Sequence, residues 1–224
     1  MRLAVFSDVH GNALWLDAVL KKIRTAQVER LYFLGDSVSY FPDSFAVIRR
    51  LQEVGAICVE GNHDNMLRGE FPIPEKNDAA YRLKPVLQTI PPDLLEFVRD
   101  WPVTRTEKID NVRIQFVHGN PLDPLKGYSY EDSPLSEFDS PELDVVFVGH
   151  THRPWVRQNP HTLMVNVGSV GLPRDVGCAP SWVLFDTKTR DVRVNRLRMS
   201  PAELLKTYPD VHESVRECLK RGGL

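Results

Sequence analysis

The hydrophobic and polar positions of the first sixty residues alternate between short apolar runs and amphipathic stretches. Apolar runs at residues 2–6, 30–34 and 56–60 predict buried strands. The segment after Asn12 and residues 43–54 carry apolar side chains at helical spacing, and Asn12 suits the cap of the first helix. This alternation predicts a parallel sheet flanked by helices.

The pattern changes after residue 100. Residues 64–100 are predicted to be mostly helical, with breaks at prolines. Later apolar segments predict strands that pair antiparallel in a second sheet, at 103–107, 112–117, 144–148, 162–167, 181–186 and 191–197. The proline-rich residues 119–142 predict a long surface loop. Ser200 to Lys206 predict a capped helix, and we expect a single domain over residues 1–224 with a helical extension at about 200–224.

Composition narrows the class of protein. The 224 residues include 42% hydrophobic and 26% charged side chains, which suits a packed domain rather than a disordered chain. A net charge of −2 without blocks of like charge argues against nucleic-acid and membrane-surface binding. The three cysteines are scattered, and the acid at residue 8 comes too early for a signal-peptide core. We therefore expect a cytoplasmic protein with reduced thiols.

Polar residues gather where five of the predicted strands end. These ends read Asp8-Val9-His10-Gly11-Asn12, Gly35-Asp36, Gly61-Asn62-His63-Asp64, His118-Gly119 and Gly149-His150-Thr151-His152. Because the C-terminal ends of parallel strands lie together and form the usual ligand crevice, we expect these side chains to form one cluster.

The residue types in this cluster point to metal chemistry. Carboxylates, imidazoles and an amide oxygen suit divalent metals such as manganese, iron or zinc. Asp8 and His10 are two residues apart, as are His150 and His152, so each pair can leave its strand end on the same side. Two metals about 3.5–4 Å apart form a clamp for in-line attack at phosphorus, with a metal-bound hydroxide as nucleophile.

Each of these residues alone has a simpler explanation. A single Asp after a strand most often caps the next helix, and a single strand-end His is usually structural. The cluster is favoured because five of the seven histidines lie in these strand ends. His161 and His212 lie outside them and receive no role.

The ordered motifs DVHGN, GD, GNHD, VHG and GHTH resemble the calcineurin-like metallophosphoesterase superfamily, from Asp8 to about Arg174. The later NVGSVGLPRD is similar to small bacterial phosphodiesterases of that superfamily. The resemblance implies an α/β fold, a four-layer α/β/β/α sandwich of two mixed sheets with the site at one edge.

The resemblance also implies a role for each matching residue. One metal would be held by Asp8, His10, Asp36 and His152, and the other by Asp36, Asn62, His118 and His150. Asp36 would bridge the two ions. Manganese is the metal that we expect, and iron, zinc and nickel are the alternatives. His63 would act on the scissile phosphate or the leaving oxygen without binding metal. Asp64 would orient His63 or cap the next helix.

The chain departs from the protein phosphatases of this superfamily. Their Asp-Arg-Gly is replaced by Ser39, Tyr40 and Phe41, and we expect the Phe41 ring to narrow the mouth of the site. Arg174 or Arg153 could contact a second phosphate through its guanidinium, and the alternative for each is a surface arginine without a role. We predict that Tyr128 and Tyr130 in the proline-rich loop bind the substrate together with Arg174. We expect Trp155 to be partly buried beneath the site.

The leading hypothesis is a metal-dependent phosphoesterase acting on a small-molecule phosphodiester or phosphoanhydride, such as a nucleotide. The alternative is a phosphomonoesterase, including a protein phosphatase. A non-catalytic protein scaffold and a DNA nuclease are less favoured, because every expected ligand position holds a competent ligand and the net charge is near neutral. The oligomeric state stays open.

Overall fold

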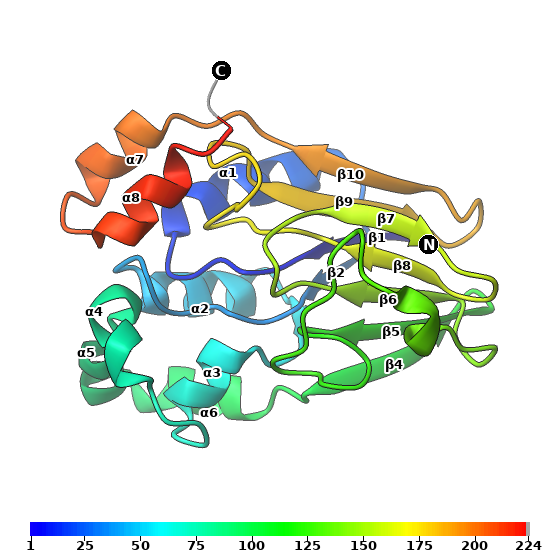
Figure 1. Cartoon of the computed structure of the whole chain (residues 1–224), viewed down its shortest axis with the longest axis horizontal. Helices are drawn as coiled ribbons and strands as arrows, with labels where there is room; N and C mark the ends of the chain where they lie inside the picture. Colours follow the sequence, from blue (N-terminus) through cyan, green and yellow to red (C-terminus); the bar gives the residue numbers. More distant parts are fainter. Residues whose placement is uncertain (223–224) are drawn as a thin grey trace.

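The computed structural model describes residues 1–222, and within them the strands form two mixed five-stranded sheets. The first sheet has the order β10-β9-β1-β2-β3 (Figure 1). Strands β1, β2 and β3 are parallel to one another, whereas β9 pairs antiparallel with both β1 and β10. Its strands are β1 (Arg2–Phe6), β2 (Arg30–Phe33), β3 (Ile57–Cys58), β9 (Ser181–Asp186) and β10 (Val192–Arg196). The predicted parallel sheet is confirmed, and two strands from late in the chain extend it.

The second sheet has the order β4-β5-β6-β8-β7. Its strands are β4 (Thr104–Ile109), β5 (Val112–Val117), β6 (Val145–Val148), β7 (Trp155–Gln158) and β8 (Leu163–Asn166). The antiparallel pairing predicted here is wrong for its centre, because β5, β6 and β8 are parallel. The long segment 118–144 carries the chain back to the starting end of the sheet before β6 begins. β7 escaped prediction because only Trp155 of its four residues is buried.

The two sheets pack face to face through an apolar core. Leu3 and Val5 of β1 point into this core, whereas Ala4 and Phe6 point to the opposite face, as the two-residue period of a strand requires. The stacked rings of Tyr32 and Phe116 join the sheets at a centroid distance of 3.9 Å.

Helices cover the outer face of the first sheet, and a loop covers that of the second (Figure 1). The helices before the second sheet are α1 (Ala13–Thr25), α2 (Ser44–Glu53), α3 (Asn62–Leu67), α4 (Asp78–Tyr81), α5 (Leu83–Thr89) and α6 (Pro92–Arg99), with the 3-10 turn η1 (Glu75–Asn77). On the second sheet the layer is the 3-10 helix η2 (Leu135–Phe138) and the rest of the 119–142 loop. The predicted α/β/β/α sandwich of two mixed sheets is confirmed, with η2 and its loop as the fourth layer.

The predicted C-terminal extension contains α7 (Pro201–Thr207) and α8 (Glu213–Leu219), and its residues 223–224 lie outside the described part of the chain. Side chains of both helices belong to one apolar cluster with Trp15, Phe41 and Leu172. That residues 1–224 form one domain stays a prediction. Among residues 1–222, no helix combines the length and the apolar character that crossing a membrane requires.

Candidate metal centre

The polar ends of β1, β2, β3, β5 and β6 meet at one edge of the sandwich, and all seven predicted metal ligands are buried there. Backbone hydrogen bonds join the loops that carry them. His10 N donates to Asp36 O at 2.9 Å, and Gly149 N donates to His118 O at 2.9 Å. A third link crosses between the sheets, where His150 N donates to the Asp8 carboxylate at 3.0 Å. The two sheets therefore hold the polar residues in one place.

The first half of the cluster contains Asp8, His10 and His152. The Nε2 atoms of His10 and His152 are 3.1 Å apart. The Oδ1 atom of Asp8 is 3.1 Å from Nε2 of His152 and 3.7 Å from Nε2 of His10. These three ligand atoms surround one point that could hold a cation.

The second half contains Asn62, His118 and His150. Nε2 of His118 lies 3.1 Å from Oδ1 of Asn62 and 3.0 Å from Nδ1 of His150. Asp36 stands between the halves, since its Oδ2 atom is 3.4 Å from Nε2 of His118 and 3.6 Å from Nε2 of His10. One carboxylate is thus within reach of both groups of ligands.

The ring orientations fit metal binding. The Nδ1 atoms of His118 and His152 lie 2.8 and 2.6 Å from the carbonyl oxygens of Leu34 and Leu172. A carbonyl only accepts, so each Nδ1 donates. In the neutral ring Nε2 then keeps its lone pair, which is the tautomer that a metal ligand needs. His10 is held in the same way by Val38 O at 3.1 Å. Two unprotonated Nε2 atoms then face each other across the first half, an arrangement that a cation stabilises.

The charges of the cluster support the same interpretation. Burial opposes the charge on Asp36, but His118 and His63 hold the pKa of Asp36 well below its usual range. Burial lowers the pKa of His150 to about 3 and that of His63 to about 4. At His118 burial opposes the charged form, but the neighbouring Asp36 raises the pKa to about 9. Ionised carboxylates beside mostly neutral imidazoles are the protonation states from which divalent cations are bound.

Three buried atoms at these strand ends have no hydrogen-bond partner among the described residues. They are Oδ1 of Asp8, Nδ1 of His63 and Nε2 of His150. A buried polar atom without a partner is costly, so such atoms commonly mark a missing ion or ligand. The donor set therefore fits the divalent metals predicted from the sequence.

His63 lies beside the cluster, at the first turn of α3. Its Nε2 atom is 4.0 Å from Oδ2 of Asp36, and together with His10 these residues form a third group able to surround an ion. Asp64 does not bond to the His63 ring. It accepts hydrogen bonds from the backbone N–H groups of Gly61, Asp36 and Ser37 at 3.0, 2.7 and 2.9 Å. Of the two roles predicted for Asp64, the structure therefore shows the capping role, because Asp64 accepts hydrogen bonds at the start of α3.

A narrow cavity of about 40 Å³ is lined by His63 and by four of the predicted metal ligands, Asp36, Asn62, His150 and His152. Its remaining walls are the predicted Arg174 and Tyr128, together with Tyr40 and Tyr81. The Tyr128 ring packs on His150 at a centroid distance of 4.3 Å. Tyr130 stands outside this cavity, stacked on Tyr128 at 6.0 Å. Of the two tyrosines predicted from this loop, Tyr128 therefore lines the cavity and Tyr130 does not.

Two aromatic residues differ from expectation. Phe41 does not narrow the mouth of the site, because it is 1% exposed and packs on Tyr208 at 5.6 Å. Tyr81, which the sequence analysis missed, packs edge-on against His63 at 4.4 Å. It comes from a one-turn helix in a proline-broken segment, and nothing in its sequence neighbourhood indicates a site. Trp155 is buried as expected, and its Nε1 donates to Ser129 O at 3.1 Å.

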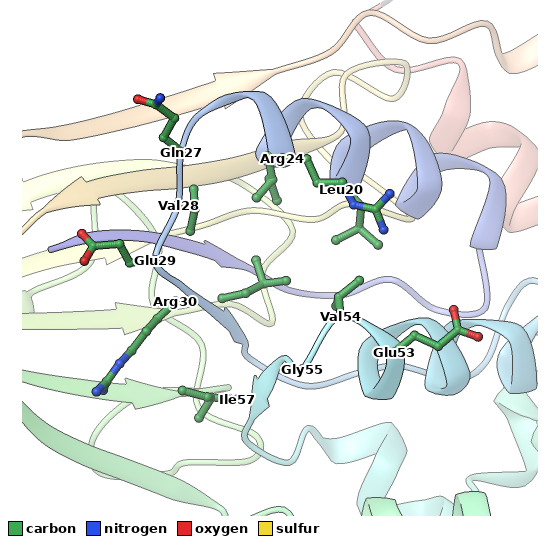
Figure 2. Close-up of a pocket in the computed structure, with 12 residues that line it drawn as sticks. Leu20, Arg24, Gln27, Val28, Glu29, Arg30, Glu53, Val54, Gly55 and Ile57 are labelled. Carbon is green, nitrogen blue, oxygen red and sulfur yellow. The ribbon is translucent and has the colours of Figure 1, made fainter.

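A separate cavity of about 450 Å³ lies between the end of α1, the start of β2 and the turn after α2 (Figure 2). Leu31 and Ile57 line it from the starting ends of β2 and β3, so it is at the opposite edge of the sheet from the predicted metal ligands. Of its charged residues, Arg30 is paired with Glu107 at 3.0 Å and Glu53 with Arg50 at 2.9 Å. Because Arg30 and Glu53 are already engaged in ion pairs, the polar cluster at the strand ends is the better candidate for a catalytic site.

Comparisons with known proteins agree with this geometry. The calcineurin-like phosphoesterase superfamily domain matches residues 1–190. The chain is 28% identical to an uncharacterized protein of Methanocaldococcus jannaschii over 226 residues, which cover 93% of this chain and 91% of that protein. The crystal structure of a metallophosphoesterase from Sphaerobacter thermophilus is similar with a TM-score of 0.80 and 25% identity, over 99% of this chain and 100% of that one.

A third relative is named for its substrate. The symmetrical bis(5'-nucleosyl)-tetraphosphatase of Salmonella typhimurium is 31% identical over 112 residues, which are 48% of this chain and 40% of that enzyme. The similarity thus spans less than half of either protein. Together with the match over residues 1–190 and the buried ligands at the strand ends, it leads to one conclusion: the chain belongs to the calcineurin-like phosphoesterase superfamily.

Proposed function

We propose that this protein is a phosphoesterase with a dinuclear metal centre that hydrolyses a phosphodiester or phosphoanhydride in a small molecule. The observation that carries the proposal is the place of Asp36, within 3.6 Å of imidazole nitrogens in both halves of a buried donor set. A carboxylate with no cation beside it would be costly at 1% exposure. Two cations that share Asp36 offset that cost.

In this proposal the ligands divide as the superfamily pattern implies. One ion is held by Asp8, His10, Asp36 and His152, and the other by Asp36, Asn62, His118 and His150. Two divalent ions bound there would supply Lewis-acid chemistry, polarising the phosphoryl group and making water a better nucleophile. Manganese is our first choice, since carboxylate, amide and imidazole ligands suit a metal of intermediate softness.

The remaining residues of the cavity act on the substrate directly. His63 is assigned to the transition state, where it hydrogen bonds to the phosphoryl oxygens or protonates the leaving oxygen. Arg174 makes no ion pair with a carboxylate within residues 1–222, and its guanidinium donates to the Tyr40 hydroxyl at 3.5 Å. An unpaired guanidinium at the edge of a metal centre is suited to binding phosphate oxygens.

The size of the cavity bears on the reacting group. About 40 Å³ beside the proposed ligands is a small space, so we place only a phosphoryl group in it and the rest of the substrate outside. The named activity of the Salmonella relative supports hydrolysis of phosphorus–oxygen bonds in nucleotides, with no more than half of each chain in common. We propose a cytoplasmic location, consistent with the expected reduced thiols.

The experiment that tests this function compares two nitrophenyl esters. Metal-stripped full-length protein is titrated with Mn²⁺ and assayed with bis-p-nitrophenyl phosphate and with p-nitrophenyl phosphate. We expect manganese-dependent hydrolysis that is faster for the diester. Faster cleavage of the monoester would reassign the protein as a phosphomonoesterase, and no cleavage of either, with two ions bound, would contradict the proposal.

A further inference from the structure

A third cavity, of about 460 Å³, lies beside the small cavity of the candidate metal centre. Three chain segments separate the two cavities, and each segment contributes neighbouring residues to both. Tyr128, His152 and Arg174 line the small cavity, whereas Tyr130, Arg153 and Asp175 line the larger one. Because neighbouring residues of the same three segments line both cavities, the two cavities lie close together.

Aromatic rings lead from one cavity to the other. The His150 ring is 4.3 Å from that of Tyr128, and Tyr128 is 6.0 Å from Tyr130 with the two planes only 8° apart. Tyr130 is 40% exposed, so a face of its ring is available to a ligand. A flat ring of a ligand, stacked on the exposed face of Tyr130, would extend the series formed by His150, Tyr128 and Tyr130.

The polar groups of the larger cavity are available as well. Within residues 1–222, no ion pair engages Arg153, Glu131 or Asp132. Asp175, in contrast, is held by Arg196 through two contacts of 2.7 and 2.8 Å. Free carboxylates accept hydrogen bonds from hydroxyl groups, and a planar guanidinium can stack on a ring or donate to its edge.

The loop that carries these groups is fixed in place before any ligand arrives. The indole of Trp155, 5% exposed, donates to Ser129 O at 3.1 Å. Arg157 donates to the carbonyl oxygens of Glu131 and Ser133, both at 2.8 Å. A preformed wall lowers the entropy lost on binding, which favours recognition of a small ligand.

We propose that the larger cavity binds a nucleoside esterified to the scissile phosphate, with the base on Tyr130 and the sugar hydroxyls facing Glu131 and Asp132. This inference rests on the proposed phosphoesterase function and names its substrate as a nucleoside phosphodiester. The two free carboxylates disfavour a second phosphate in the same place, since like charges repel there. The structure thus favours a nucleoside attached directly to the reacting phosphorus over a polyphosphate chain.

The kinetic test uses two substrates with the same leaving group. Manganese-loaded full-length protein is assayed with thymidine 5'-(p-nitrophenyl phosphate) and with methyl p-nitrophenyl phosphate. We expect kcat/KM to be about tenfold higher for the thymidine ester, the size of one base-stacking contact. The ratio should fall toward one in Tyr130→Ala and in Arg153→Ala, and it should persist in Tyr130→Phe, which keeps the ring. Leu122→Ala, in the same loop but 67% exposed and outside both cavities, should keep the wild-type ratio.

A binding test without metal separates this inference from the function on which it rests. Saturation-transfer NMR with adenosine and metal-stripped protein should give transfer to the base protons, which Tyr130→Ala removes and Leu122→Ala retains. If neither nitrophenyl ester is cleaved but adenosine binds through Tyr130, the proposed chemistry is wrong and the nucleoside site stands. Equal cleavage of both esters, together with no adenosine signal, overturns the nucleoside site.

Discussion

At the scale of single residues, the proposed metal ligands stand out by their backbone. Five of the seven have a left-handed conformation, with φ of 55° at Asp8, 52° at His10, 61° at Asp36, 62° at His150 and 58° at His152. Such a conformation costs a non-glycine residue about 1–3 kcal/mol and persists only where the surroundings enforce it. Here the backbone bonds among the loops enforce it, and the side chains are thereby turned into the cluster.

His63 gives the prediction that belongs to this scale. His63→Ala should retain both metal ions but lose turnover by about 10²-fold or more, because a group that acts on the transition state is removed while the proposed ligands remain. Metal content by mass spectrometry and hydrolysis of bis-p-nitrophenyl phosphate measure the two effects.

The matched control for His63 is His161→Ala. His161 is an exposed histidine bound to Asp139 at 2.8 Å, far along the chain from every strand end of the cluster. It should keep wild-type activity. Loss of metal from His63→Ala would instead make His63 a ligand, in line with its place near His10 and Asp36.

At the scale of elements, Asp64 fastens the start of α3 to the loop after β2. Besides its three backbone donors, it accepts a hydrogen bond from the Ser37 hydroxyl at 2.6 Å. The loop also depends on close approach, since a Cβ on Gly61 would lie 2.3 Å from Oδ1 of Asp36. This junction sets where the Asp36 carboxylate points.

We predict that Asp64→Ala lowers the free energy of unfolding by about 3 kcal/mol, because several buried donors lose their acceptor. Urea denaturation followed by circular dichroism measures the change. Asp93→Ala, at an exposed first-turn acid of α6, should cost less than about 1 kcal/mol. Equal losses in the two variants would show that Asp64 acts only as a helix cap.

At the scale of the whole molecule, the centre belongs to both sheets. Asp8, Asp36 and Asn62 follow strands of the first sheet, whereas His118 and His150 follow strands of the second. Ions bound to the proposed ligands of both sheets would cross-link the two halves of the fold. Binding that occurs only in the folded state stabilises it by mass action.

Mn²⁺ should therefore raise the thermal midpoint of the metal-stripped protein. At a free concentration about 100 times the dissociation constant, the gain in stability is about 2.7 kcal/mol for one site. Differential scanning calorimetry at increasing Mn²⁺ measures it. Asp36→Asn should respond far less, because both proposed sites lose the carboxylate they share. An undiminished rise of the midpoint in that variant would rule out the bridging role.

Local periodicity was enough to predict much of the fold. The strand-helix alternation of residues 2–58, the Asn12 cap and the helix after Ser200 all depend on neighbours in sequence, and the structure has them. β7 and the parallel centre of the second sheet depend on where the chain returns after a long loop, which periodicity does not encode. The same holds for β9 and β10, which join the first sheet.

The sequence by itself determined which residues could bind metal, since glycine-flanked Asp, Asn and His after apolar strands are a local pattern. Only the tertiary structure decided how they face one another, that Phe41 turns into the core under α7 and α8, and that Tyr81 reaches His63 from a distant segment. The physical reason is the separation along the chain of the residues that interact. Ligand identity and strand period are set by adjacent residues, whereas cavity walls are set by packing between segments that are far apart in the chain.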